Sequence, residues 1–254
     1  MQRLGPWLDD ASGLGSEHRL FDGAPFASAW VSINRATREG RNPSTNHNRI
    51  HLCGAGAGLT GEGLDALLAM MQDEGIDTFF IRLTPGPGMD HARALIRAAG
   101  FERHPWTRYP VLALAEAARP AMATDLTVRS VDRAGALAAR EAMGTAMWPG
   151  FLASAGAPGF HHFLAFDGER PVAHAAMALR EGIAYLGWMS TAEAARRRGA
   201  QQALIAARVA LARDLGADHI VTEALTILAS SRANLERAGF HEVYERETYG
   251  RMRS

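Results

Sequence analysis

The sequence contains no lysine, so all 27 of its basic residues are arginines. Without a lysine amine, the chain supplies neither the phosphate-binding lysine of a P-loop nor a Schiff-base nucleophile. The strand lysine of a protein kinase is excluded on the same ground. Cys53 is the single cysteine, which excludes an internal disulfide and a cysteine-rich zinc site. Several classes of enzyme are therefore excluded before any motif is considered.

Long apolar runs are also missing. Met1–Asp10 lacks the apolar segment of a signal peptide, and the longest stretch without charged residues, Ala142–Phe166, is interrupted by prolines, glycines and two histidines. We therefore expect no membrane span and a cytoplasmic protein. The 27 basic and 27 acidic residues cancel, which argues against a nucleic-acid or membrane-surface partner that binds through bulk charge.

An internal repeat indicates two domains. Arg93–Phe101 aligns without a gap on Arg232–Phe240, and five of the nine positions are identical, including the final Gly-Phe. With 254 residues, of which 47% are apolar, the chain is long enough for two cores of typical domain size. We predict domains at residues 1–120 and 121–254, joined through the alanine-rich stretch Glu116–Asp125.

The repeat extends beyond these nine positions. A helical pattern, a Gly-X-Asp turn and an apolar strand precede each copy, and a further strand pattern follows it. The predicted strands are Thr78–Ile81 and His219–Thr222 before the copies, and Thr107–Leu114 and Glu242–Tyr249 after them.

The second half predicts an α+β (α/β) fold with a mostly antiparallel sheet. Turn signals at Asp167-Gly168 and Glu181-Gly182 separate three consecutive strand patterns. The predicted helix Gly199–Leu215 carries a small or apolar stripe. The remaining predicted elements are the strands Leu126–Val131, His162–Phe166, Val172–Leu179 and Ile183–Met189, the helix Arg133–Gly144, and the stripe residues Ala203, Ala207, Leu211 and Leu215.

Three consecutive cations, Arg196–Arg198, stand immediately before the predicted helix, followed by Gly199. Cations at this end of a helix oppose the macrodipole and cost up to about 1 kcal/mol each. An anion bound at the free backbone N–H groups would reverse that argument, and Gly199 permits close approach of such a ligand. The alternative is a solvated arginine-rich turn.

This strand, the R-x-x-G-x loop, the helix, a second strand and a helix ending in Gly-Phe resemble the GNAT N-acetyltransferase superfamily over most of Leu126–Tyr249. The first half resembles a diverged second copy, which makes the chain similar to tandem GNAT proteins. The resemblance implies two tandem GNAT-like domains, the second of which binds acetyl-CoA as a co-substrate.

The resemblance also implies residues for the cofactor site. Arg196 and Gly199 match the first and fourth positions of the family's pyrophosphate loop. Backbone N–H groups of Arg197, Arg198, Ala200, Gln201 and Gln202 would bind the phosphates, although Gln201 replaces a small residue. Met189, Ser190 and Thr191 match the strand end that pairs with the pantetheine arm.

Catalytic candidates follow from the chemistry of amine acylation. The family's tyrosine acid aligns with Leu235, and its asparagine at the start of that segment with Leu228. Ser231 lies four residues before Leu235, on the same helix face, and is either a replacement proton donor or a helix N-cap.

A base is needed because a protonated amine cannot attack a thioester. Glu223, which follows the predicted strand His219–Thr222, is either that base or an exposed strand-end acid. His174 is a weaker candidate, better explained as a buried histidine bonded to backbone. His161 and His162 lack a metal-ligand pattern, so we expect no metal.

A glycine-rich segment in the first half offers a competing interpretation. Gly56–Gly61 fits G-x-G-x-x-G before a helix, with Asp77 near the spacing of a ribose-binding acid. However, Asp77 precedes its strand, whereas that acid should end it. The segment is better interpreted as a degenerate acyl-CoA loop that has lost the arginines.

Three functional hypotheses remain open at this stage. The first is an acetyl-CoA-dependent N-acyltransferase acting directly on an amine of a small molecule or peptide. The second is a non-catalytic acyl-CoA-binding or sensor protein, favoured by Leu235. The third is a nicotinamide-dependent oxidoreductase using Gly56–Gly61. The sequence leaves both the acceptor and the choice between monomer and homodimer open.

Overall fold

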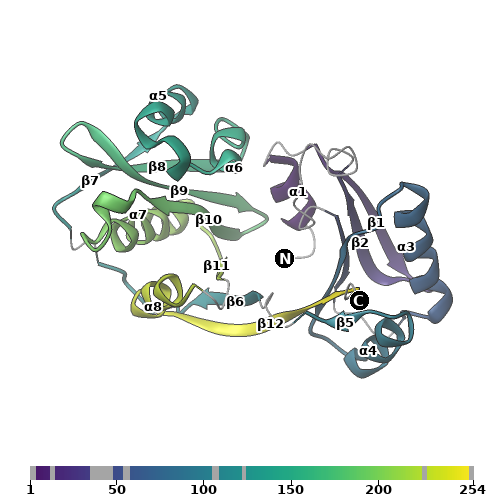
Figure 1. The fold of residues 1–254 in the computed structure, drawn as a ribbon. Helices are drawn as coiled ribbons and strands as arrows, with labels where there is room; N and C mark the ends of the chain where they lie inside the picture. Colours follow the sequence, from purple (N-terminus) through teal and green to yellow (C-terminus); the bar gives the residue numbers. More distant parts are fainter. Residues whose placement is uncertain are drawn as a thin grey trace. The chain divides into compact units, whose positions relative to one another are not determined.

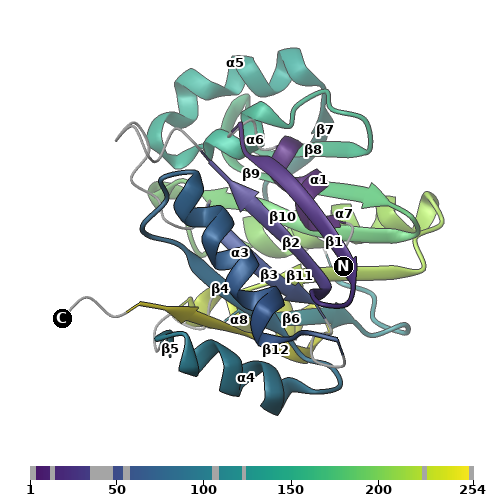
Figure 2. The same ribbon diagram turned by 90° about the vertical axis from the view of Figure 1, so that its right-hand side faces the viewer.

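The computed structural model describes residues 4–11, 15–34, 48–53, 58–104, 109–121, 124–224 and 228–251. The chain divides into two compact units, whose folds are drawn in Figures 1 and 2. Unit 1 consists of Met1–Asp10, Leu14–Pro110 and Tyr244–Ser254, and unit 2 of Ala11–Gly13 and Val111–Val243. In the described residues, no helix is long and apolar enough to cross a membrane.

Unit 1 contains a mixed sheet in the order β1-β2-β3-β4-β12, with β5 beside β12. Strands β1 to β3 are antiparallel, while β3 and β4 are parallel. One face of the sheet presents Val31, Ile50 and Ile81 to Leu67 and Ile96 of helices α3 and α4, all fully buried. The elements are α1 (Leu4–Ala11), β1 (Glu17–Gly23), β2 (Ala27–Ile33), β3 (Arg49–Cys53), α3 (Gly61–Asp73), β4 (Phe80–Thr84), α4 (Met89–Ala98) and β5 (Glu102–Arg103).

Unit 2 contains a sheet in the order β12-β6-β11-β10-β9-β8-β7. Strands β10 and β11 are parallel, whereas the pairs β6–β11, β9–β10, β8–β9 and β7–β8 are antiparallel. Helix α7 covers one face through Ile205 and Val209, and α5 packs against Leu164 and Ala176 on the other. The elements are β6 (Tyr109–Leu114), β7 (Thr127–Val131), α5 (Arg133–Met143), η2 (Gly144–Ala146), α6 (Pro149–Ala153), β8 (Phe160–Asp167), β9 (Arg170–Arg180), β10 (Ile183–Thr191), η3 (Glu193–Ala195), α7 (Ala200–Asp214), β11 (His219–Glu223), α8 (Ala229–Arg237) and β12 (Phe240–Gly250).

The predicted elements of the second half are present with small shifts at their ends. The helix predicted at Gly199–Leu215 spans Ala200–Asp214. Its predicted stripe is wrong at Leu215, which is 45% exposed, because the helix buries a face that contains Leu204, Ile205 and Arg208 instead. In the first half, the strand predicted at Thr78–Ile81 spans Phe80–Thr84, since Ile76 and Phe79 enter the core from the preceding loop.

The sequence repeat corresponds to a repeated structure. In each unit a helix connects two parallel strands, β3 to β4 through α3 and β10 to β11 through α7, and a second helix follows. Gly100 and Gly239 end these second helices with φ angles of 82° and 90°, which favour glycine. Phe101 and Phe240 then enter the two cores with 1% and 3% exposure.

The two halves exchange their last strands. Strand β6 belongs to the first half of the sequence but pairs with β11 in unit 2, where Val111 lies opposite Glu223. Strand β12 ends the second half, yet its last residues pair with β4 and β5 in unit 1, where Glu247 lies opposite Leu83. The predicted boundary at residue 120 divides the two sequence repeats and stays a prediction. The compact units do not test it, because segments of the two units alternate along the chain.

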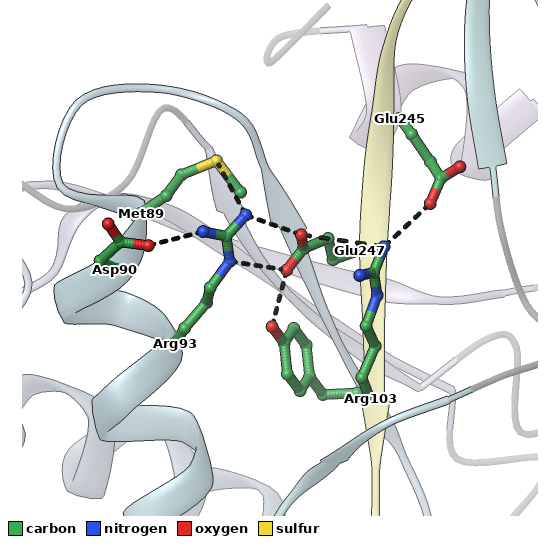
Figure 3. A network of polar contacts seen from close by, with 7 residues as sticks. Met89, Asp90, Arg93, Arg103, Glu245 and Glu247 are labelled. Atoms are coloured by element: carbon green, nitrogen blue, oxygen red, sulfur yellow. Dashed lines mark hydrogen bonds and ion pairs between the residues drawn. The ribbon is translucent and has the colours of Figure 1, made fainter.

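A polar network fastens the C-terminal strand to unit 1 (Figure 3). Arg93 of α4 donates to both carboxylate oxygens of Glu247, from Nε over 3.1 Å and from Nη2 over 2.8 Å. The Tyr249 hydroxyl donates to Glu247 over 2.6 Å. Burial alone would raise the pKa of Glu247, but these donors and the Arg103 charge hold it below its ordinary value. The exchanged strand is thus held by a bidentate ion pair as well as by its backbone.

Arg93→Met should destabilise unit 1 by about 2–4 kcal/mol, because it leaves the buried Glu247 carboxylate without its main partner. Denaturant unfolding of the variant and the wild-type protein measures this loss in the free energy of unfolding. Arg97→Met removes an exposed arginine from the same helix and is the matched control, expected within about 0.5 kcal/mol of wild type. Equal stabilities of the two variants would contradict this role of the ion pair.

The same ion pair predicts a pH dependence. Because the pKa of Glu247 is lowered on folding, its contribution is present above the unfolded pKa and is lost as the pH falls through the folded pKa. Wild-type unit 1 should therefore lose this stability under acid, below about pH 4.5. Glu247→Gln should be less stable at neutral pH and show a flatter decline below that pH.

Candidate functional site

The parallel strands β10 and β11 part within unit 2. Their pairing runs from Ile183 opposite His219 to Leu186 opposite Thr222, while β10 continues to Thr191. The Thr222 hydroxyl donates to the Leu186 carbonyl over 2.7 Å at the last pair. The predicted site residues Met189–Thr191 and Glu223 therefore lie beyond the point where the two strands separate.

A β-bulge in β10 lies next to this point. Gly187 pairs with Ala176 and Ser190 with His174, so Trp188 and Met189 together face one residue of β9. Trp188 has a φ of 46°, which is strained for a bulky side chain. Its ring contacts those of Phe160 and Tyr185, at centroid distances of 5.6 and 5.9 Å. The bulge interrupts the regular pairing of β10 with β9 beside the predicted pantetheine segment.

The loop before α7 leaves the start of that helix open. Gly199 is the N-cap with a φ of 81°, and no side chain caps the helix. Arg197 also has a positive φ of 66°. Within the described residues, the backbone N–H groups of residues 197–202 donate no hydrogen bond to protein, and Ala203 is the first that does. Such a series of free N–H groups at a helix start is suited to bind an anion.

The three loop arginines differ in their environment. Arg198 is paired with Asp167 over 2.6 Å and with Asp125 over 2.5 Å, and Asp167 above all raises its pKa. Arg196 lies 4.0 Å from Glu193, both side chains being exposed, and Arg197 is exposed. Arg198 therefore anchors the loop to unit 2, while Arg196 and Arg197 are the side chains available to a phosphate group.

Sequence reasoning missed a polar link between the loop and α8. Gln201 donates to the Ser231 hydroxyl over 3.3 Å and accepts from the Asn234 amide. Gln202 donates to the Asn234 carbonyl over 2.7 Å. The signal was present in Gln201, where the family has a small residue, because a long amide at a helix start needs a partner. These bonds join the predicted phosphate loop to the helix that carries Ser231.

The sequence offered two residues for the proton-donor position, Leu235 by alignment and Ser231 as its replacement. Leu235 is 4% exposed and packs in the core with Ile205 and Ile220. Ser231 is the third residue of α8, whose N-cap is Leu228. The interpretation of Ser231 as the N-cap is therefore wrong, because the helix begins earlier than that interpretation requires. Ser231 stays a predicted proton donor.

Glu223 ends β11 as a half-buried residue. It pairs with Val111 of β6 and follows Thr222, the last residue of β11 in the ladder with β10. Side chains alternate along a strand, so Glu223 shares a face with Val221, opposite the face on which Ile220 meets α7. Glu223 therefore lies beside the point where the two strands separate, and it stays a predicted base.

His174 is fully buried in β9 next to the bulge. Its Nε2 lies 3.2 Å from the Trp148 amide and 3.2 Å from the Ala146 carbonyl. Burial lowers its pKa to about 4, so it is neutral near pH 7, and its bonds to backbone match the structural interpretation. The described residues contain no group of three or more His, Cys, Asp and Glu side chains that could hold a metal.

The start of helix α3 in unit 1 is capped, unlike that of α7. Thr60 caps α3 by accepting from the Gly63 amide over 3.1 Å, and a Cβ at Gly63 would lie only 2.1 Å from the Pro25 carbonyl oxygen. The β3–β4 ladder runs through to Cys53 opposite Thr84. Residues 54–57 of the glycine-rich segment lie outside the described residues, and Asp77 precedes β4 as the sequence indicated. The start of α3 thus offers fewer free donors than that of α7.

Comparison with known proteins identifies the fold and finds a family model that matches part of unit 2. Residues 134–240 match the family model described as Acetyltransferase (GNAT) family. A GCN5-related N-acetyltransferase from Kribbella flavida is 17% identical, with a TM-score of 0.65 over 98% of this chain and 94% of that chain. A search of curated protein sequences found no match.

Two further solved structures share the fold at similar identity. A tandem GNAT protein from the clavulanic acid biosynthesis pathway is 12% identical, with a TM-score of 0.55 over 97% of this chain and 88% of that chain. A GCN5-related N-acetyltransferase from Sphaerobacter thermophilus is 14% identical, with a TM-score of 0.53 over 92% of this chain and 76% of that chain. The tandem GNAT fold predicted from the sequence is confirmed, and residues 134–240 match the model of the GNAT acetyltransferase family.

Proposed function

We propose that the protein is an acetyl-CoA-dependent N-acyltransferase that moves an acetyl group directly to an amine of a small molecule or peptide. The observation that carries the proposal is the open start of α7, with N–H groups of residues 197–202 unused by the described protein. It follows a strand that ends in a bulge where β10 and β11 separate. An elongated thioester with anionic phosphates fits this order, because its phosphates match the free N–H groups and its thioester end matches the bulge.

In this proposal the phosphates of acetyl-CoA bind the backbone N–H groups of Arg197, Arg198 and Ala200–Gln202. Arg196 supplies a charge-assisted contact, and Gly199 allows close approach. The pantetheine arm pairs with Met189, Ser190 and Thr191 in place of the β11 strand, which ends its pairing at Leu186. The thioester then lies beside the bulge and Glu223.

The reaction forms a C–N bond and breaks a C–S bond. The amine nitrogen attacks the thioester carbonyl carbon, and Glu223 takes a proton from the nitrogen directly or through water. Backbone N–H groups near Met189 stabilise the oxyanion. The intermediate collapses to an amide and a thiolate, which takes a proton from Ser231 or from water to leave as CoA. The proton taken up by Glu223 then passes to solvent, and solvent restores the proton of Ser231. Ser231 keeps its own proton for this step, because Gln201 donates to its oxygen.

A second candidate function is an acyl-CoA-binding sensor without turnover. The observation in its favour is Leu235, a buried core residue where the family's tyrosine acid would stand. Release of CoA thiol from acetyl-CoA, measured against a panel of amines, separates the two functions. Acceptor-dependent release supports the enzyme, whereas tight binding without release under any amine supports the sensor.

One acetyl-CoA should bind per chain. The first-half segment Gly54–Gly63 carries no cation, and two or three missing charge-assisted bonds of about 1.5–3 kcal/mol each would move micromolar binding beyond the millimolar range. Titration calorimetry on the full chain should therefore give a stoichiometry near one. The full chain is required because unit 2 takes β6 from the first half. A stoichiometry near two would show that the first segment also binds.

A further inference from the structure

Arg208 is a buried cation on α7 with an exposed fraction of 2%. Its Nε donates to the Leu204 carbonyl over 2.9 Å, and its Nη1 to the carbonyls of Ala176 over 3.1 Å and Gly187 over 3.3 Å. Its Nη2 lies 3.4 Å from the sulfur of Met189. Burial lowers its pKa to about 9, which leaves it protonated near pH 7.

No carboxylate of the described residues compensates this charge, since burial is the sole cause of the change in its pKa. Backbone carbonyls satisfy the donors of the guanidinium without neutralising it. A charge in this position is costly compared with an apolar side chain of similar volume. The burial of Arg208 therefore needs an explanation other than packing.

The contacts of Arg208 lie on both sides of the strained residue Trp188. It bonds the carbonyl of Gly187 before Trp188 and contacts the side chain of Met189 after it. Residues in sparsely populated backbone regions persist where surrounding contacts hold them. Arg208 holds the bulge from the α7 side, while Phe160 and Tyr185 contact the Trp188 ring.

The direction of the Gly187 carbonyl determines where the next N–H group points. In a planar trans peptide the C=O and N–H bonds point in opposite directions. Because the Gly187 carbonyl points at Arg208, the Trp188 N–H points away from it. The guanidinium also polarises this peptide unit at its negative end, which strengthens the N–H as a donor.

We infer that Arg208 is a positioning residue that holds the β10 bulge so that its backbone N–H groups polarise the acyl carbonyl. This inference rests on the proposed function, because the carbonyl in question is that of bound acetyl-CoA. Arg208 touches no substrate itself; it acts through the Gly187–Trp188 peptide unit and Met189. Its fixed charge behind the bulge also favours the negative charge that develops on the thioester oxygen.

Isotope-edited infrared spectroscopy of acetyl-CoA labelled with ¹³C at the carbonyl tests this inference. Bound to the wild-type protein, the carbonyl band should lie at lower frequency than in free acetyl-CoA. In Arg208→Met it should return toward the free position, while the dissociation constant changes less than about threefold. With an accepted amine, kcat should fall about 10–100-fold at nearly constant KM, less than the loss of an oxyanion donor outright.

Arg213→Met is the matched control. Arg213 lies on the same helix and also donates to two backbone carbonyls, those of Glu116 and Ala118, but away from the bulge. This variant should keep the wild-type band and kcat. If the methionine variant of Arg208 fails to fold, Arg208→Lys replaces it, because one ammonium cannot reproduce the fork of bonds. The lysine variant should give an intermediate band.

The outcomes separate this inference from the proposed function. A band at the wild-type position in folded Arg208→Met, or in Arg208→Lys, overturns the role of Arg208 and leaves the acyltransferase proposal standing. Failure of the wild-type protein to bind acetyl-CoA overturns the proposed function and the inference with it. If the carbonyl band moves toward the free position in both Arg208→Met and Arg213→Met, the shift is a general effect of removing an arginine from α7. That result also overturns the inference.

Discussion

Gly199→Asp should abolish acetyl-CoA binding in a chain that remains folded. The substitution places a carboxylate among the free N–H groups at the start of α7, where the pyrophosphate is proposed to bind. It also introduces a Cβ at a φ of 81°. Losing two charge-assisted bonds of about 1.5–3 kcal/mol each weakens binding about 10²–10⁴-fold, before repulsion is counted. Calorimetry with acetyl-CoA measures the loss.

Two control variants separate charge from backbone strain. Gly216→Asp introduces the same side chain at the other end of α7, where φ is 75° and an added Cβ meets nothing within 4 Å. It should bind acetyl-CoA as the wild-type protein does. Gly199→Asn keeps the shape without the charge and tolerates the left-handed region, so it should lose much less affinity. Wild-type affinity in folded Gly199→Asp would exclude this loop as the phosphate site.

Glu223→Gln should lower turnover by about 10²–10⁴-fold, the usual contribution of a general base. The amide keeps the size of the side chain at the end of β11 but cannot take a proton from the attacking amine. Acetyl-CoA affinity should stay nearly constant, because the residue lies beyond the proposed phosphate and pantetheine contacts. Thiol release with an accepted amine gives kcat, and calorimetry gives the affinity.

Glu181→Gln provides the matched control, since Glu181 is an exposed acid at the turn between β9 and β10. It should leave both quantities unchanged. Full activity of Glu223→Gln would assign the proton transfer to another group or to water. Loss of acetyl-CoA binding in that variant would show instead that Glu223 supports the cofactor site.

Local signals predicted most of unit 2. The turns at Asp167-Gly168 and Glu181-Gly182 separate β8, β9 and β10, and the glycines take the positive φ angles that these turns require. The arginine-rich loop could be placed at the start of α7 because the helix dipole and the backbone freedom of glycine affect only residues close in sequence. These features depend on neighbours in sequence, which is why the sequence alone revealed them.

Features that depend on distant partners were not predictable in this way. The exchange of β6 and β12 depends on which sheet edge each strand meets, and their alternating patterns fit either edge. The burial of Arg208 contradicts the general exposure of arginine and follows from carbonyls of β9 and β10. Likewise, Gln201 reaches Ser231 and Asn234 across 30 residues or more of sequence.

The exchange of strands also sets the order in which the protein is completed during synthesis. The ribosome makes β4 and β5 early, but the strand that lies between them comes from the last residues of the chain. The nascent first unit therefore carries an unpaired sheet edge while the whole second half is translated, and such edges invite aggregation. Unit 2 already has β6 available by then. A premature stop codon or a proteolytic cut before Tyr244 would thus damage the half of the protein that was made first.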